Sequence, residues 1–251
     1  MKLTWHIDSE DVARLKKLQS EEGHRTFVRN RIRHNIENRR RDVPPRGEIW
    51  QKLIGCLLTT QQRSGPDGAV QRFLSLDPFP LGLDRCLASR DRYSLVFEAL
   101  TDFGGLRRTK TNATFAEHNL AFLEDGGWDH LSAQLDLLIG ETDRGVERSV
   151  ARHVAGWIKG FGPKQARNFL QWLRLTRYEI PLDSRIVRWL NQNGFPIHLT
   201  AQPLSDTAYF EFVLDGVQEL CSAADLFPCE FDALVFASFD EGDWDDRVHL
   251  W

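Results

Sequence analysis

Apolar residues recur along most of the chain at helical spacing, three or four positions apart, and no part of it alternates like a series of strands. Between Glu48 and Gln62, for example, the residues Ile49, Leu53 and Leu57 fall on one face. Similar faces run over 94–100, 106–123, 128–139, 206–220 and 230–239. Clusters rich in Gly, Pro, Asp and Ser separate these segments, as at 64–68, 104–105 and 125–127. The pattern predicts an all-α protein of about ten helices with no internal repeat.

The most informative segment runs from 145 to 194. An apolar stripe of helical period ends at Lys159, and Gly160-Phe161-Gly162 follows. Two glycines permit a tight turn, because glycine tolerates positive φ and close approach of another group. Pro163 suits the first turn of a new helix, whose apolar residues at 166, 169, 170 and 173 keep the helical spacing. This pattern predicts a helix–hairpin–helix, in which amides at a helix N-terminus are free to bind a DNA phosphate.

Two chemically suggestive residues flank the second helix of this motif. Lys164 lies two residues beyond the second hairpin glycine, and Asp183 follows 19 residues later, after an extended Ile180-Pro181-Leu182. Asp183 is a predicted N-cap for another helix, and Gly194 is its predicted C-terminal stop. The alternative interpretation is that Lys164 faces solvent and that Asp183 only caps its helix.

Composition excludes several classes of protein. With 251 residues, of which 41% are apolar and 27% charged, the chain is expected to be a soluble globular protein. It has no apolar run long enough for a membrane span, and its first residues lack the apolar stretch expected of a signal peptide. The four cysteines are scattered without a CxxC pair, which argues against a zinc knuckle, a four-cysteine iron–sulfur loop and a secreted disulfide scaffold. We therefore expect a cytoplasmic protein.

The net charge of −4 conceals an uneven distribution of charge. Seven arginines and one acid, Glu37, lie between Arg25 and Arg41, which we call the basic stripe. An acidic run follows at 240–246 and is interpreted as a solubilising tail. The basic stripe has two open interpretations, a phosphate-binding surface or a solvated helix face.

The segments 158–166 (Ile-Lys-Gly-Phe-Gly-Pro-Lys-Gln-Ala) and 181–183 (Pro-Leu-Asp) resemble the helix–hairpin–helix superfamily of DNA glycosylases. Weaker support comes from Leu-Leu-Thr-Thr-Gln-Gln at 57–62 and from the basic turn at 105–110, so that the resemblance covers roughly 48–195. Because the chain lacks the family's C-terminal four-cysteine loop, the similarity is greatest to the cluster-free 8-oxoguanine DNA glycosylase/AP lyase branch. A second departure is Arg185, which stands where the family often has His.

The resemblance implies a fold and a reaction. It implies two helical subdomains that flank a cleft: a terminal lobe from 1–49 and 185–251, a helical barrel at 50–155, and the hairpin with the catalytic segment at 156–184. Lys164 would attack the sugar C1′ and form a Schiff base, which requires an amine of lowered pKa, and the carboxylate of Asp183 would stabilise the positive charge that develops there. The expected activity is excision of a damaged purine, most simply 8-oxoguanine, with strand nicking. The alternatives are a glycosylase for alkylated or other modified bases, and a non-catalytic helix–hairpin–helix DNA-binding protein.

The resemblance also implies how such a protein would bind DNA. Gly160, Phe161, Gly162 and Arg185 would contact the backbone, as would Arg107 and Arg108. Gln61 and Gln62 stand where the family fills the gap left by the flipped nucleotide, although they are also explained as polar residues ending a helix. Trp50 and Trp251 are candidates for stacking on the base. We expect a monomer that binds double-stranded DNA with a damaged base and needs no cofactor, apart from a structural monovalent cation at the carbonyls of Gly156, Ile158 and Phe161.

Overall fold

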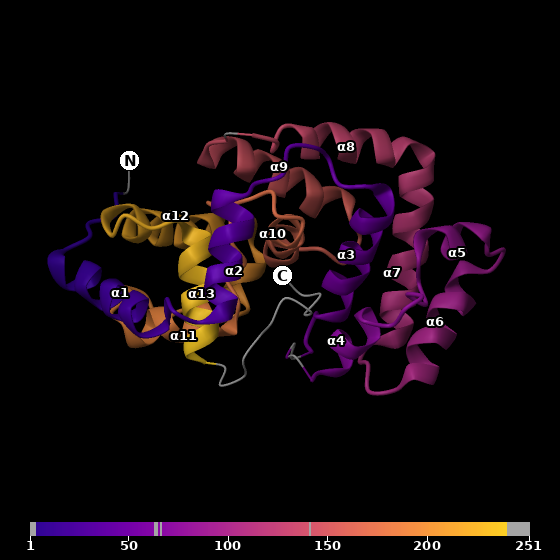
Figure 1. Cartoon of the computed structure of the whole chain (residues 1–251), viewed down its shortest axis with the longest axis horizontal. Helices are drawn as coiled ribbons and strands as arrows, with labels where there is room; N and C mark the ends of the chain where they lie inside the picture. Colours follow the sequence, from indigo (N-terminus) through magenta and orange to yellow (C-terminus); the bar gives the residue numbers. More distant parts are fainter. Residues whose placement is uncertain (1–3, 63–64, 66, 141, 240–251) are drawn as a thin grey trace.

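The computed structural model describes residues 4–62, 65, 67–140 and 142–239, and the described part of the chain is helical without a β-strand (Figure 1). The elements in chain order are α1 (Ser9–Glu22), α2 (Thr26–Ile32), η1 (Arg33–Glu37), α3 (Arg46–Leu58), α4 (Ala69–Leu74), α5 (Leu83–Ala88), α6 (Arg92–Phe103), α7 (Thr109–Phe122), η2 (Leu123–Gly127), α8 (Trp128–Asp136), α9 (Arg144–Trp157), α10 (Pro163–Trp172), α11 (Ser184–Gln192), η3 (Pro203–Ser205), α12 (Thr207–Ala223) and α13 (Pro228–Ser238). The predicted all-α fold is therefore confirmed.

The helices pack in two groups (Figure 1). The first combines both ends of the described chain: α13 packs on α1, α2, α11 and α12. In the second, α3 packs on α4, α5 and α7, while α6 packs on α7 and α8 on α9. Helix α10 lies between the groups, against α3 and α9 on one side and η3 on the other. The helix that follows the hairpin is thus central to the molecule.

Element boundaries follow from local chemistry. Helix α3 begins at Arg46 directly after Pro45, so the boundary expected between 49 and 50 falls inside this helix. Helix α7 begins at Thr109 rather than near 106, because Gly104, Gly105 and Arg108 all have positive φ and cannot continue a right-handed helix.

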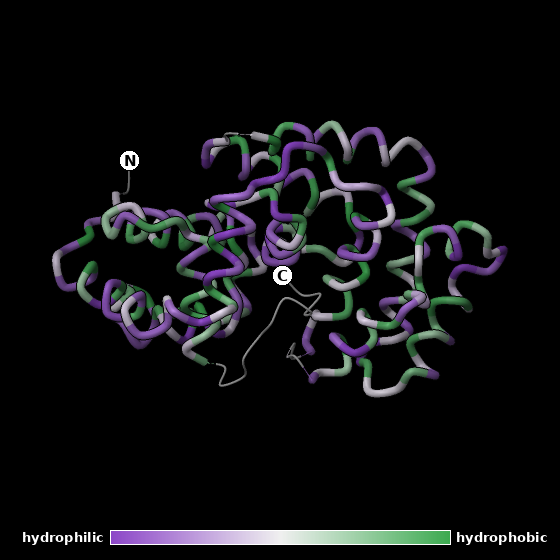
Figure 2. The backbone as a smooth tube through the Cα atoms, viewed as in Figure 1, coloured by the Kyte–Doolittle hydropathy of each residue, from purple (hydrophilic) through white to green (hydrophobic). Residues whose placement is uncertain are grey.

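The buried interior consists mainly of aliphatic and aromatic side chains. Hydrophobic and hydrophilic positions alternate along the helices, as amphipathic packing requires (Figure 2). Four phenylalanines are among the largest fully buried side chains. Phe210 and Phe231 lie in the first group of helices, Phe73 lies in the second, and Phe169 lies on α10. Within the described residues, no helix combines the length and the apolar character needed to cross a membrane.

Candidate active site

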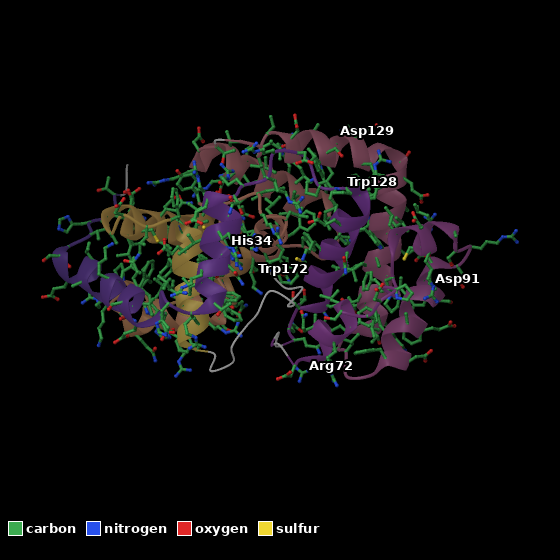
Figure 3. All side chains as sticks on the ribbon, in the orientation of Figure 1. His34, Arg72, Asp91, Trp128, Asp129 and Trp172 are labelled. Carbon is green, nitrogen blue, oxygen red and sulfur yellow. The ribbon has the colours of Figure 1, made fainter. Side chains whose placement is uncertain are left out.

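A cavity of about 1440 Å³ opens between the two groups of helices. The hairpin, the start of α10, the start of α11 and the end of α13 contribute to its wall. Trp172, at the end of α10, lines the cavity and lies between the two groups (Figure 3). Lys164 and Asp183 both line this cavity, so the fold brings together the two residues that the sequence singled out.

The hairpin has one glycine that its conformation requires. Gly160 has a φ of +91°, and a Cβ there would lie 2.4 Å from a ring carbon of Phe115. Gly162 differs: it is extended, caps α10, and a Cβ added to it would meet nothing within 4 Å. Phe161 turns inward and packs against Phe169 at a ring distance of 5.6 Å, so that only its backbone can face a ligand. Gly162 therefore leaves open space in front of the N-terminus of α10.

Lys164 is the second residue of α10 and is half-buried in the cavity wall. Its charge acts on Cys56 of α3: burial raises the pKa of this thiol, and the Lys164 ammonium opposes part of the rise. The neighbouring Gln165 donates from Nε2 to the Cys56 carbonyl at 2.8 Å and to Thr60 Oγ1 at 2.7 Å. These bonds fix the start of α10 against the end of α3.

Asp183 is the N-cap of α11, as the sequence predicts. Its Oδ1 accepts from the backbone N–H groups of Arg185 at 2.8 Å and Ile186 at 3.0 Å. Its Oδ2 pairs with Arg185 Nη1 at 3.1 Å. The Arg185 guanidinium also lies 4.1 Å from the ring centroid of Phe236. The carboxylate is thus held in one orientation, in a partly exposed position on the cavity wall.

A buried ion pair connects the elements that carry Lys164 and Asp183. Arg167, one turn after Lys164 in α10, donates from Nε to Glu179 Oε2 at 2.7 Å, and both side chains are fully buried. Glu147 of α9 accepts from the N–H groups of Tyr178 at 2.8 Å and Glu179 at 3.0 Å. The extended segment that leads to Asp183 is therefore anchored to both helices of the hairpin motif.

The far wall of the cavity holds a polar pair that the sequence analysis missed. Arg31 of α2 lies 3.6 Å from Asp232 of α13, and both residues are at least nine-tenths buried. Burial raises the pKa of Asp232 to about 6, although the charge of Arg31 lowers it. Beside the pair, the rings of Phe27 and Phe236 stack at 4.4 Å. One signal pointed to Asp232: it is a carboxylate within the otherwise apolar run at 231–237.

The loop after α3 contributes Gln61 and Gln62, and the structure separates their roles. Gln62 binds the turn before α7: its Nε2 donates to the Gly105 carbonyl at 2.9 Å, and its Oε1 accepts from Arg107 N–H at 2.8 Å. Gln61 is exposed with a φ of +57° and projects at the cavity rim. Arg107 and Arg108 lie on the same turn, outside the cavity lining.

Of the two tryptophans considered for base stacking, Trp50 does not reach the cavity. It is 1% exposed in the core of the second group, and its Nε1 donates to the Leu81 carbonyl at 2.8 Å. Trp251 lies outside the described residues. The carbonyls considered for a monovalent cation belong to Gly156, Ile158 and Phe161, where α9 ends and the hairpin begins. The Ile158 carbonyl accepts from Phe161 N–H at 3.1 Å and keeps a second lone pair, which suits a cation of this type.

Much of the basic stripe is used inside the protein. Arg31 lines the cavity beside Asp232, and Arg40 donates to the Leu173 carbonyl at 2.8 Å. Arg39 donates to the carbonyls of Leu138 and Leu175, both at 3.2 Å. These arginines therefore have structural partners, and the stripe is not a continuous exposed surface.

Comparison with solved structures supports the architecture. The structure of Methanocaldococcus jannaschii 8-oxoguanine glycosylase/lyase in complex with a 15mer DNA containing 8-oxoguanine has a TM-score of 0.67 and 16% sequence identity, covering 93% of this chain and 99% of that one. The 8-oxoguanine DNA glycosylase of the same organism gives a TM-score of 0.65 at 16% identity, covering 93% and 95%. The 8-oxoguanine DNA glycosylase of Thermotoga maritima gives 0.62 at 15% identity, covering 92% and 97%.

No protein-family model and no curated protein sequence matches the chain. At 15–16% identity the structural likeness establishes the fold. The chain therefore has the all-α fold of the 8-oxoguanine DNA glycosylases, in agreement with the resemblance of its sequence.

Proposed function

We propose that this protein is a base-excision DNA glycosylase that removes a damaged purine, with 8-oxoguanine as the first candidate, and that nicks the strand through Lys164. The observation that carries the proposal is that Lys164 and Asp183 line one cavity directly beside the open N-terminus of α10. A non-catalytic DNA-binding hairpin would need neither residue. The substrate named for the similar solved structures, 8-oxoguanine, supports the choice of base.

In the proposed reaction, the unprotonated Lys164 amine attacks C1′ of the flipped nucleotide. The bond from C1′ to the base nitrogen breaks, and its electron pair leaves with the base, which then takes up a proton. The C1′–O4′ bond then breaks while a proton passes from the Lys164 nitrogen to O4′, which leaves a Schiff base between Lys164 and C1′. Loss of a proton from C2′ then breaks the C3′–O bond by β-elimination, and the 3′ phosphate leaves with that oxygen. Asp183 stabilises the positive charge at C1′ during bond breaking, because its carboxylate is held in a fixed direction by the start of α11.

The hairpin would hold one phosphate of the damaged strand. The amides at the N-terminus of α10 have the partial positive charge that favours an anion, and nothing fills the space in front of Gly162. A monovalent cation held by the carbonyls of Gly156, Ile158 and Phe161 would add a positive charge at the same place. Arg185 would contact a second phosphate while it keeps Asp183 oriented.

Gln61 is the residue we propose to fill the gap left by the flipped nucleotide. It is exposed on the cavity rim, whereas the amide of Gln62 is already engaged with the turn at 105–107. The flipped base would enter the cavity towards Phe27 and Phe236. The partly desolvated Arg31–Asp232 pair offers both a donor and an acceptor to its polar edge.

The decisive experiment is a panel of duplexes, each with a single lesion, scored for base release and for strand nicking with and without borohydride. The proposal expects release of 8-oxoguanine, nicking without added base, and a covalent protein–DNA product in the presence of borohydride. Release of an alkylated purine instead would change the substrate but keep the enzyme class. Duplex binding without release of any base would identify a non-catalytic binding protein.

A further inference from the structure

Helix α7 lies behind the hairpin and contributes no residue to the cavity wall. Its residue Asn119 is fully buried and pairs with the backbone of Lys159 through two hydrogen bonds. Lys159 N–H donates to Asn119 Oδ1 at 2.7 Å, and Asn119 Nδ2 donates to the Lys159 carbonyl at 3.0 Å. One side chain therefore binds both backbone polar groups of the residue that precedes the hairpin turn.

The turn held in this way has a conformation that needs support. Gly160 follows Lys159 directly and has a φ of +91°. Phe115, one helical turn before Asn119, packs against the same glycine and leaves no room for a Cβ. Helix α7 thus fixes the hairpin from behind in two ways, by paired hydrogen bonds and by shape.

The same helix holds a second turn. Asn112 Nδ2 donates to the Arg107 carbonyl at 3.2 Å, and this side chain is also buried. Seven residues in an α-helix make nearly two turns, so Asn112 and Asn119 lie on one face, about 10 Å apart along the axis. Helix α7 therefore fixes the backbone conformation of both the hairpin and the basic turn at 105–110.

We propose that Asn119 is a positioning residue for DNA binding: it holds the Lys159–Gly160 peptide so that the amides of the hairpin face a phosphate, with Asn112 doing the same for the turn that carries Arg107 and Arg108. This inference rests on the proposed DNA glycosylase function. Asn119 does not line the cavity and acts only through the backbone of Lys159. Its contribution is therefore to binding, and the chemical step belongs to other residues.

The expected loss of duplex affinity depends on the fraction of time that the turn spends in the conformation that binds a phosphate. When a site is competent for only a fraction of the time, its apparent dissociation constant rises by the inverse of that fraction. Without Asn119, both polar groups of the Lys159 backbone lose their partner, and turns that satisfy them differently become accessible. A turn that is competent for about a tenth of the time would bind duplex about tenfold more weakly.

The test compares Asn119→Leu with Leu120→Ala. Leucine has nearly the shape of asparagine but makes no hydrogen bond, so the first variant removes both bonds without opening a cavity. Leu120 is the next residue of α7, is 1% exposed, and packs in the core, so its truncation destabilises the same helix without releasing the hairpin. Three quantities are measured at a temperature where both variants are folded: the Kd for undamaged duplex, the single-turnover excision rate at saturating enzyme, and amide hydrogen exchange of 156–165 without DNA.

For Asn119→Leu we expect a Kd raised about tenfold, an excision rate within about threefold of the wild type, and faster exchange in the hairpin. For Leu120→Ala we expect a loss of stability with an unchanged Kd and unchanged hairpin exchange. Should Asn119→Leu not fold, Asn119→Ser replaces it, because its short hydroxyl reaches at most one partner and the same direction of change is expected.

The inference is overturned if the folded Asn119 variant binds undamaged duplex as the wild type does, or if Leu120→Ala weakens binding equally. A wild-type protein that neither binds duplex nor releases a base would instead disprove the proposed function. In that case the exchange measurement still decides whether Asn119 holds the hairpin.

Discussion

Lys164 and Asp183 are positioned at the cavity by different contacts. Lys164 depends on the start of α10, which Gln165 ties to α3, whereas Asp183 is oriented by the N–H groups of its own helix and by Arg185. Substitution of either residue can therefore remove chemistry without removing the fold, which makes both suitable for direct tests.

Lys164→Gln should abolish strand nicking and borohydride trapping while duplex binding stays within a few-fold of the wild type. The reason is that glutamine keeps the length and polarity of the side chain but has no nucleophilic amine. The matched control is Lys159→Gln, which removes an exposed amine on the other side of the hairpin. Covalent trapping that survives in the Lys164 variant and disappears in the Lys159 variant would move the nucleophile to Lys159.

Asp183→Asn should reduce base excision by a factor of about a hundred or more, because it removes the negative charge near C1′. The free energy of unfolding should fall by about 1 kcal/mol or less, since asparagine is also a good N-cap. Excision rates under single-turnover conditions and chemical denaturation measure the two effects separately. Near-normal excision would leave Asp183 with a capping role only.

Asp232 should make the stability of the protein depend on pH in an unusual direction. Burial raises its pKa from 3.8 to about 6, so between these values the folded state binds more protons than the unfolded state. Ionisation of this group therefore lowers the free energy of unfolding as pH rises from about 4 to 6, by about 3 kcal/mol at most. Most carboxylates in folded proteins have the opposite effect.

The measurement is chemical denaturation at several pH values between 4 and 7 for the wild type and Asp232→Asn. Relative to the wild type, the variant should become progressively more stable as pH rises through this window. Parallel curves for the two proteins would mean that Asp232 titrates normally and is not held in an apolar environment.

Among the elements, the hairpin is where the structure most changes the interpretation of the sequence. Both glycines were expected to serve the same turn, yet only Gly160 has positive φ, and Gly162 is extended in front of open space. The two positions should therefore respond differently to the same substitution.

Gly160→Ala should destabilise the protein by about 1–3 kcal/mol, because alanine is strained at this φ and its methyl group meets Phe115. Gly162→Ala should leave stability within about 0.5 kcal/mol but weaken binding to damaged and undamaged duplex alike, because the methyl group enters the space we assign to a phosphate. Thermal unfolding and duplex titrations test the pair. An unchanged duplex affinity for Gly162→Ala would place the phosphate elsewhere.

The elements that the sequence predicted well are those that local chemistry determines. The N-cap at Asp183, Pro163 in the first turn of α10 and the stop at Gly194 each depend on residues within a few positions. Contacts between distant segments could not be predicted in this way. Arg31 meets Asp232 because α2 packs on α13, and Asn119 meets Lys159 because α7 supports the hairpin. Periodicity in a single sequence predicts that such faces are buried, without indicating which faces meet.

For the whole molecule, the question is how a chain with a net charge of −4 would bind a polyanion, as the proposed function requires. The proposed answer is local: the hairpin and Arg185 line one cavity, and Gln62 of the same lining binds the turn with Arg107 and Arg108, so the field there is set by nearby groups. The basic stripe contributes less to the field at the cavity than its number of arginines indicates. On α2, Phe27 and Arg31 line the cavity, whereas Arg29 is two residues from each and so points to the opposite side of the helix. Arg25 precedes α2, pairs with Glu22 at 3.6 Å and does not line the cavity.

The salt dependence of duplex binding distinguishes these two basic regions. Each phosphate contact contributes about 0.9 to the slope of log K against log salt, because its formation releases counterions. Arg107→Gln with Arg108→Gln should therefore lower the slope by about 1.8 if both residues bind phosphates, and should weaken binding to all sequences equally. Arg25→Gln with Arg29→Gln removes the same charge from the molecule but should leave the slope unchanged, because neither side chain lines the cavity or lies on the turn that Gln62 binds. A lower slope for the second pair would extend the DNA-binding surface over the terminal lobe. Equal slopes for all three proteins would leave the phosphate contacts to the hairpin and Arg185.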